Sequence, residues 1–168
     1  MTPSDGRKPV MTQTMGILER RRIEAEILKP VYEEMAARLG EATAQEILGA
    51  AITKAALAAA KSFAATEPEG TSLKSFADLQ PLWTKDDALR LEVKRQDDTH
   101  FDYNVTRCRY AEMYREMGLG SIGHLLSCNR DAAFCTGYDP RIKMERTQTI
   151  MQGADHCDFR YRFDAKEE

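Results

Sequence analysis

Apolar residues recur at helical spacing through the first third of the chain. Between residues 17 and 39 they fall three or four positions apart, and Gly40 follows as a natural helix stop. A second helix is expected over residues 44–65, with a buried face of small residues at Ala51, Ala55, Ala58 and Ala59. A third, short helix is expected over residues 72–79, ending before Pro81. The chain should therefore begin with a helical segment.

From Leu89 onward the spacing of apolar residues changes from the helical pattern to every second residue. Leu89, Leu91 and Val93 alternate with charged residues, and Phe101, Tyr103 and Val105 alternate again after the turn-forming QDDT. This pattern predicts a hairpin. Helices over residues 107–117 and 121–136 and strands over 142–151 and 157–163 complete the prediction. Their order indicates an α+β fold in which an antiparallel sheet of about four strands, in two hairpins, is covered by helices.

Length and composition narrow the function. The 168 residues suit one domain, which we place at residues 14–168, after a flexible tail at 1–13. A net charge of -3, with basic and acidic residues interspersed, argues against nucleic-acid and membrane partners. We see no long apolar run and no leader, and expect a cytoplasmic protein whose four cysteines are reduced. Homo-oligomerisation stays open.

A polar stripe marks the helix predicted over residues 121–136. His124, Cys128, Asp131 and Cys135 follow one another at i, i+4, i+7 and i+11, which places them on one face of an α-helix. Two cysteines can serve there as small buried apolar residues, with His124 and Asp131 at the wetter edge. A packing stripe would more often use Leu, Ile or Val, so a functional site is the competing interpretation.

The last strand separates two kinds of side chain. Cys157, Phe159, Tyr161 and Phe163 share one face, whereas His156, Asp158, Arg160 and Arg162 share the other. The aromatic face should meet the helices and carry Cys157 inward toward Cys128. His156 and Asp158 should turn away, toward a second surface or a subunit contact. An inert core thiol is the alternative for Cys157.

Two further segments carry candidate binding residues. In NVTRC, residues 104–108, Thr106 is a plausible N-cap and Arg107 lies in the first helical turn, where a carboxylate can be held. Arg107 as a solvated surface charge is the alternative. In RTQT, residues 146–149, Arg146 and Gln148 share one strand face, and Thr147 and Thr149 the other. Either a polar pocket or simple strand propensity explains that segment.

Three segments together resemble a known family. NVTRCRYAEMYREMG, LLSCNRDAAF and RTQTIMQGADHCDFRY are similar to the L-2-amino-thiazoline-4-carboxylic acid hydrolase family of small bacterial proteins, with the match closest over residues 104–161. The resemblance implies a hydrolase that opens the cyclic isothiourea of L-2-amino-thiazoline-4-carboxylate with water, giving N-carbamoyl-L-cysteine.

The resemblance suggests roles for the candidate residues. Cys128 would attack the ring carbon, with Cys157 beside it and Asp131 or His124 moving protons. In the alternative, a carboxylate activates water and the cysteines only shape the pocket. Arg107 or Arg146 would anchor the substrate carboxylate. The other candidate substrate-binding residues are Asn104, Thr149, His156 and Asp158.

A second, fainter likeness concerns GADHCDF, residues 153–159, which is similar to the end of 4-vinyl-reductase-type small-molecule sensor domains. Some of those domains hold zinc, but Thr149 stands where another cysteine is expected. No cofactor is required by the sequence. A zinc site, if present, would use Cys128, Cys157 and either His124 or Asp131. The rival function is therefore a non-catalytic domain that binds a small molecule.

Overall fold

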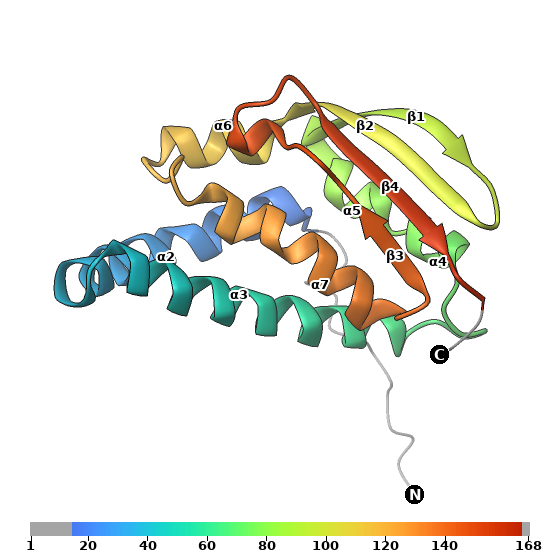
Figure 1. The fold of residues 1–168 in the computed structure, drawn as a ribbon, viewed down its shortest axis with the longest axis horizontal. Helices are drawn as coiled ribbons and strands as arrows, with labels where there is room; N and C mark the ends of the chain where they lie inside the picture. The colour runs from blue at the N-terminus through green and yellow to red at the C-terminus, as the bar shows by residue number, and fades with distance from the viewer. Residues whose placement is uncertain (1–14, 166–168) are drawn as a thin grey trace, which may run out of the picture.

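The computed structural model describes residues 15–165, so the tail predicted at residues 1–13 lies outside the described part. It is an α+β fold with a four-stranded antiparallel open sheet in the order β1-β2-β4-β3. Figure 1 shows α2, α3 and α7 gathered on one side of this sheet. The helices are α2 (Ile17–Leu39), α3 (Glu41–Ala64), α4 (Leu73–Ala77), α5 (Gln80–Thr84), α6 (Arg109–Glu116) and α7 (Asn129–Tyr138). The strands are β1 (Leu89–Gln96), β2 (His100–Cys108), β3 (Ile142–Glu145) and β4 (Cys157–Phe163).

Two glycines allow the long helices to pack. Gly40 joins α2 to α3 at a φ of 84°, in the left-handed region that favours glycine. Gly137 lets α7 approach α3, since a Cβ there would lie 3.0 Å from the Ala60 Cβ. The predicted buried alanine face of α3 is wrong. Ala51, Ala55 and Ala58 are exposed and Ala59 is half-buried, while the buried face holds Ala44, Leu48, Gly49, Ile52, Ala56 and Ala60.

The sheet follows the predicted alternation. Phe101, Tyr103 and Val105 of β2 are buried, and they pair with Tyr161, Phe159 and Cys157 of β4. Tyr103 stacks on Phe159 with ring centroids 5.0 Å apart. This aromatic face meets the helices, as predicted, and the side chains between these residues point to the other face.

The strand expected over residues 142–151 is shorter. β3 ends at Glu145, and residues 146–149 form an irregular segment before the 3₁₀ turn at Ile150–Gln152. The Asp158 carboxylate explains the change, because it accepts the backbone N–H groups of Thr147 and Gln148, each at 2.9 Å. A side chain therefore takes the hydrogen bonds that a longer strand would have used.

Three helix boundaries also differ from prediction. β2 runs to Cys108, which pairs with Leu89, so α6 begins at Arg109 and Thr106 is not its N-cap. The helix expected over 72–79 is α4, and Pro81 lies in the first turn of α5, where proline is tolerated. The helix expected over 121–136 is divided into a π-helical segment, η2 (His124–Cys128), and α7.

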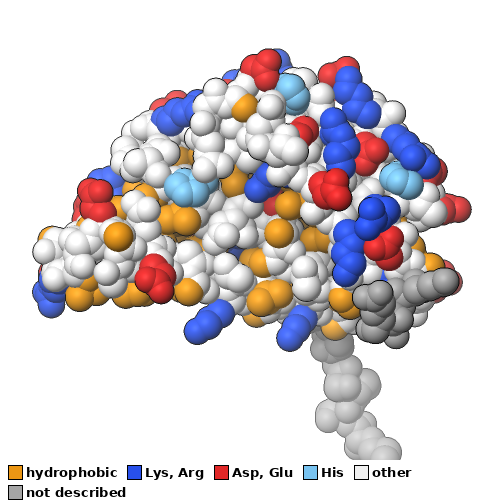
Figure 2. Space-filling view, viewed as in Figure 1, with side chains coloured by type: hydrophobic (Ala, Val, Ile, Leu, Met, Phe, Trp, Pro, Cys, Tyr) orange, Lys and Arg blue, Asp and Glu red, His pale blue; other side chains and the backbone are white. Residues whose placement is uncertain are grey.

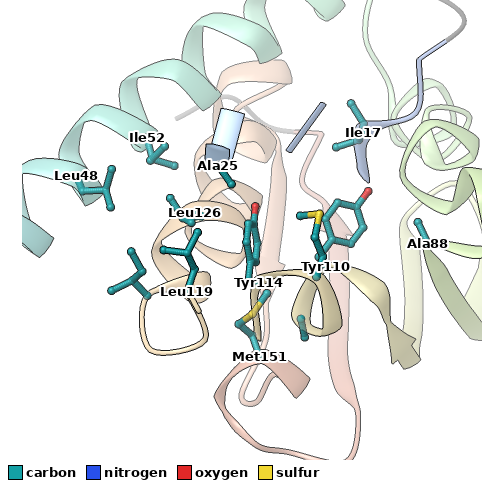
Figure 3. Packing of buried hydrophobic residues seen from close by; sticks show 13 residues of the cluster. Ile17, Ala25, Leu48, Ile52, Ala88, Tyr110, Tyr114, Leu119, Leu126 and Met151 are labelled. Atoms are coloured by element: carbon teal, nitrogen blue, oxygen red, sulfur yellow. The ribbon is translucent and has the colours of Figure 1, made fainter. Parts of the chain in front are cut away.

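One hydrophobic core joins α2, α3, α6 and η2. Figure 3 shows Tyr114 and Tyr110 side by side above Met151, with Leu126 close by. The Tyr114 hydroxyl lies 2.8 Å from the Ser127 hydroxyl, and the Tyr110 hydroxyl donates to the Trp83 carbonyl at 3.0 Å. Burying a side chain such as Leu126 stabilises the fold by about 1.5–3 kcal/mol.

Helix α3 is the most apolar long helix of the described chain. By length and composition alone it is apolar enough to cross a membrane, which corrects the prediction that the sequence contains no long apolar run. In this fold it packs against α2 and α7. Figure 2 shows hydrophobic side chains along this helical side, while charged side chains gather over the strands.

Candidate active site

A cavity of about 470 Å³ lies between α2, α3 and α7 and the aromatic face of the sheet. Its volume is typical of sites that enclose a drug-sized molecule. Ala55, Ala56 and Ala59 of α3 line it, and their short side chains leave the space open. Ile27, which is 69% exposed, also lines it and marks its open side.

Asp131 forms an ion pair at the wall of this cavity. Arg146 Nη1 donates to Asp131 Oδ2 at 2.5 Å, and Arg146 Nη2 donates to the Cys128 carbonyl at 3.2 Å. The same guanidinium lies 5.0 Å from the centre of the Phe159 ring. Arg146 therefore ties α7, the end of η2 and β4 together from the segment that follows β3.

All of the predicted site residues lie within residues 15–165, and among them only Asp131 lines the cavity. Its side chain keeps 27% exposure because it faces that space. Burial raises the pKa of the Asp131 carboxyl, although the positive charge of Arg146 acts in the opposite direction. A carboxyl with a raised pKa at a cavity wall can act as a general acid or base.

The structure brings Cys128 and Cys157 near this pair, together with Cys108, as electrostatic neighbours. All four cysteines are free thiols, as predicted. Burial raises the pKa of Cys128 to about 12 and that of Cys108 to about 11. Burial also raises the pKa of Cys157, whose sulfur accepts the Ile150 N–H at 3.2 Å. These thiols are protonated near neutral pH, which makes them poor nucleophiles.

The predicted stripe is interrupted by the π turn. His124 opens η2 and Cys128 closes it, so the wider i to i+5 turn separates them from the α-helical register of Asp131 and Cys135. Cys135 is buried with the aromatic residues of β2 and β4, and its thiol donates to the Ile142 carbonyl at 3.1 Å. His124 is half-buried and does not line the cavity.

Arg107 has other partners. At the end of β2 it donates to Glu112 at 2.9 Å and to Asp87 at 3.0 Å, with 38% of its side chain exposed. It lies in a strand and not in a first helical turn. Its guanidinium belongs to a surface ion-pair network outside the cavity lining.

The remaining predicted binding residues support the strands and loops. Asn104 accepts from Arg160 at 2.9 Å, and Thr149 caps the 3₁₀ turn by accepting the Gln152 N–H at 3.2 Å. Asp158 holds the segment after β3, and the His156 ring lies 2.6 Å from Asp155. Burial raises the pKa of Asp158, but hydrogen bonds from Thr147 and Gln148 outweigh it and lower this pKa below its usual range. Asp158 alternates with the inward-facing Cys157 along β4 and therefore lies on the other face of the sheet, as predicted, whereas His156 precedes the strand.

Four charged residues that line the cavity were missed: Arg20, Arg21, Glu24 and Arg130. Glu24 of α2 accepts from Arg21 at 2.9 Å and from Arg130 of α7 at 3.1 Å. Arg21 and Arg130 are largely enclosed, with side-chain exposures of 10% and 11%. A sequence signal existed, because Ile17, Arg21 and Ala25 share the buried face of α2 at i, i+4 and i+8, where an arginine is unusual.

Within residues 15–165, no group of three or more His, Cys, Asp or Glu side chains is placed to hold a metal ion. The proposed zinc ligands Cys128, Cys157, His124 and Asp131 therefore do not form such a group in this structure. Asp131 is engaged by Arg146 instead.

The family model of L-2-amino-thiazoline-4-carboxylic acid hydrolase matches residues 20–161. The chain belongs to the L-2-amino-thiazoline-4-carboxylic acid hydrolase family. The family match thus includes the Asp131–Arg146 pair, the arginines of α2 and every residue that lines the cavity except Ile17. No curated protein matches the sequence.

Solved structures are similar to this family member at low sequence identity. The phenol-responsive sensory domain of the transcription activator PoxR, with phenol, aligns with a TM-score of 0.53 and 13% identity over 82% of this chain and 73% of that one. A trafficking protein particle complex subunit 3 from Naegleria fowleri, covalently bound to palmitic acid, aligns with a TM-score of 0.49 and 14% identity. That alignment covers 88% of this chain and 99% of the subunit. The first likeness supports the fold alone.

Proposed function

We propose that this protein is a cytoplasmic hydrolase that opens a cyclic amidine or thiazoline ring on a substrate bearing a carboxylate. The observation that carries the proposal is the Asp131–Arg146 pair, which places a carboxyl of raised pKa at the wall of the cavity. Membership of the hydrolase family supports the same reaction class.

In this proposal Asp131 and a water molecule perform the chemistry. Asp131 takes a proton from water as the water oxygen bonds to the ring carbon between sulfur and two nitrogens. The carbon–sulfur bond then breaks as the new hydroxyl on that carbon becomes a carbonyl. The hydroxyl proton passes to the ring nitrogen, and the sulfur takes the other proton from Asp131. The products are a carbamoyl group and a free thiol, so one water is consumed per ring opened. Arg146 positions the Asp131 carboxyl.

The cysteines have a different part in this mechanism. Cys128 and Cys157 carry thiols of raised pKa and do not line the cavity, so we assign them to packing around Arg146. This favours the water mechanism over direct attack by Cys128. The substrate carboxylate is then held by Arg21 and Arg130, which line the cavity, in preference to Arg107.

The test is turnover of L-2-amino-thiazoline-4-carboxylate by the purified chain. The released thiol is followed by a colour reagent, and N-carbamoyl-L-cysteine is identified by its mass. Asp131→Asn should lower the rate by about 10²- to 10⁴-fold, the usual contribution of general acid–base catalysis. Asp158→Asn, on the outer face of the sheet, is the matched control and should retain the parental rate. An Asp131→Asn protein as fast as its parent would refute the proposal.

A non-catalytic small-molecule-binding domain is the second candidate. It is favoured by the lining of the cavity, which consists largely of Ile, Leu, Ala and aromatic side chains. The PoxR domain, which shares this fold, is by its description phenol-responsive. A parental protein that binds a carboxylate ligand in the cavity but turns over no thiazoline would establish this function instead.

A further inference from the structure

Two parts of the cavity lining differ in chemistry. Arg20, Arg21, Glu24 and Arg130 line one part, where three guanidinium groups surround one carboxylate. Phe63, Trp83 and Phe134 line another part and contact one another, with ring centroids 5.2–6.2 Å apart. A ligand that fills the cavity therefore meets cations in one part of the lining and aromatic rings in another.

The arginines keep donors for a ligand. Arg130 Nε donates to the Leu126 carbonyl at 2.7 Å and Nη2 to Glu24, and Arg21 uses Nη1 for both Glu24 oxygens. Within residues 15–165, Arg130 Nη1 and Arg21 Nη2 have no hydrogen-bond acceptor, while every fully buried side-chain nitrogen and oxygen has a partner. These leftover donors must therefore reach open space, and both residues line the cavity.

The local charge is unbalanced in the same direction. Glu24 neutralises one of three neighbouring arginines, and Asp131 is already paired with Arg146. Burial lowers the pKa of Arg130 to about 10, and the positive charge of Arg21 contributes to the same shift. An anion placed between Arg21 and Arg130 would offset this excess charge.

We infer that the cavity binds a carboxylate with an extended apolar body, its head between Arg21 and Arg130 and its body among Phe63, Trp83 and Phe134. Along α3, the lining from Ile52 to Phe63 spans roughly 16 Å at the helical rise. Such a length suits a medium-chain or arylalkyl acid better than a lone five-membered ring.

Asp131 occupies the position between head and body. It follows Arg130 directly and precedes Phe134 by one helical turn, and all three line the cavity from α7. The inference deepens the proposed function and rests on it for this reaction centre. The proposed substrates are therefore carboxylic acids with an apolar substituent, in which the reacting group lies between the carboxylate and that substituent.

Trp83 provides a direct readout, because it is the only tryptophan of the chain and it lines the cavity. Decanoate titrated into the intact protein should change Trp83 fluorescence to saturation. Decanol, which has the same chain without the charge, should bind at least about tenfold more weakly, since a charge-assisted hydrogen bond is lost. Arg130→Gln should abolish that preference, and Arg107→Gln, the same change outside the cavity, should keep it.

Matched variants on α3 test the location. Ala59→Phe fills the cavity and should weaken decanoate binding by about tenfold or more, whereas Ala58→Phe, one residue along on the exposed face, should leave it unchanged. Ala55 also lines the cavity and is exposed, so Ala55→Phe provides a second test if circular dichroism shows that Ala59→Phe unfolds at a lower temperature than the parent.

The outcomes separate this inference from the proposed hydrolysis. No saturable signal in the parental protein, equal binding of decanol, or equal effects of Ala58→Phe and Ala59→Phe would overturn the inference. Decanoate binding without thiazoline turnover would leave it standing and remove the hydrolase. Thiazoline turnover without decanoate binding would do the reverse.

Discussion

Arg146 and Arg107 both pair with carboxylates, yet they lie in opposite surroundings. Arg146 is 15% exposed, spans η2, α7 and β4, and holds a carboxyl that faces the cavity. Arg107 is 38% exposed and joins Asp87 and Glu112 at the surface. Sequence alone offered both as carboxylate anchors. The difference teaches that an arginine in this fold becomes part of a site through the enclosure of its partner.

The two acids on β4 and α7 extend the comparison. Both carboxylate oxygens of Asp158 accept hydrogen bonds from Thr147 and Gln148, which lower its pKa and give it a structural role. Asp131 has one strong partner and a face toward the cavity, and burial raises its pKa. The sheet thus separates a structural acid on its outer face from a chemically usable acid on its inner side.

Replacing Arg146 and Arg107 separately should give the largest difference in unfolding free energy. Arg146→Gln leaves Asp131 without its partner in an enclosed site, and we expect it to lower the free energy of unfolding by about 3 kcal/mol. Arg107→Gln removes a surface pair and should cost about 0–1 kcal/mol. Urea denaturation of both variants at one pH measures the contrast. Equal losses would show that Arg146 is no more embedded than Arg107.

Removing the Asp158 side chain should have the next largest effect. Asp158→Ala abolishes three hydrogen bonds that hold the segment after β3, and should cost about 1.5–3 kcal/mol of unfolding free energy. Asp155→Ala, which removes an 89% exposed neighbour, is the control and should stay within about 0.5 kcal/mol. Thermal and urea unfolding provide both values. A neutral Asp158→Ala would place the support of this segment elsewhere.

The two acids should respond oppositely to pH. The lowered pKa of Asp158 gives stability that is present above the unfolded value of 3.8 and is lost as pH falls through the lower folded value. Asp158→Asn should therefore flatten the loss of stability below about pH 4. The raised pKa of Asp131 works the other way, and its contribution fades as pH rises through the folded value. Unfolding curves measured from about pH 2 to pH 7 test both expectations. If Asp158→Asn loses stability below about pH 4 as steeply as the parent does, the assignment is contradicted.

Much of the fold was predictable because its signals are periodic. The helical spacing of α2 and the alternation of Phe101, Tyr103, Phe159 and Tyr161 set the layers and the inward face of the sheet. The π turn at His124–Cys128 has no such signal, and it interrupts the predicted stripe. The irregular segment after β3 depends on Asp158, a residue of the next strand, so local propensity could not predict it.

The sequence predicted some residues of the site but not others, because long-range contacts leave no periodic signal. Asp131, Arg146 and the neighbouring cysteines stood out as polar residues at patterned positions, and the structure brings them together. The arginines of α2 reach the cavity through the antiparallel packing of α2 on α3 and the contact of Glu24 with Arg130, which are long-range features. The protonated state of the thiols follows from burial, which the sequence does not specify.

The central claim is that Asp131 and water, not a thiolate, open the ring, and the rate of Cys128→Ser tests it most directly. Parent, Cys128→Ser and Asp131→Asn are assayed together for thiazoline turnover, with thermal unfolding measured on the same preparations. The account predicts that folded Cys128→Ser keeps a rate within about threefold of the parent, because the Cys128 thiol is already protonated and a serine leaves the cavity unchanged. A folded Cys128→Ser protein slower by about 10²-fold or more, beside an active Asp131→Asn, would contradict it.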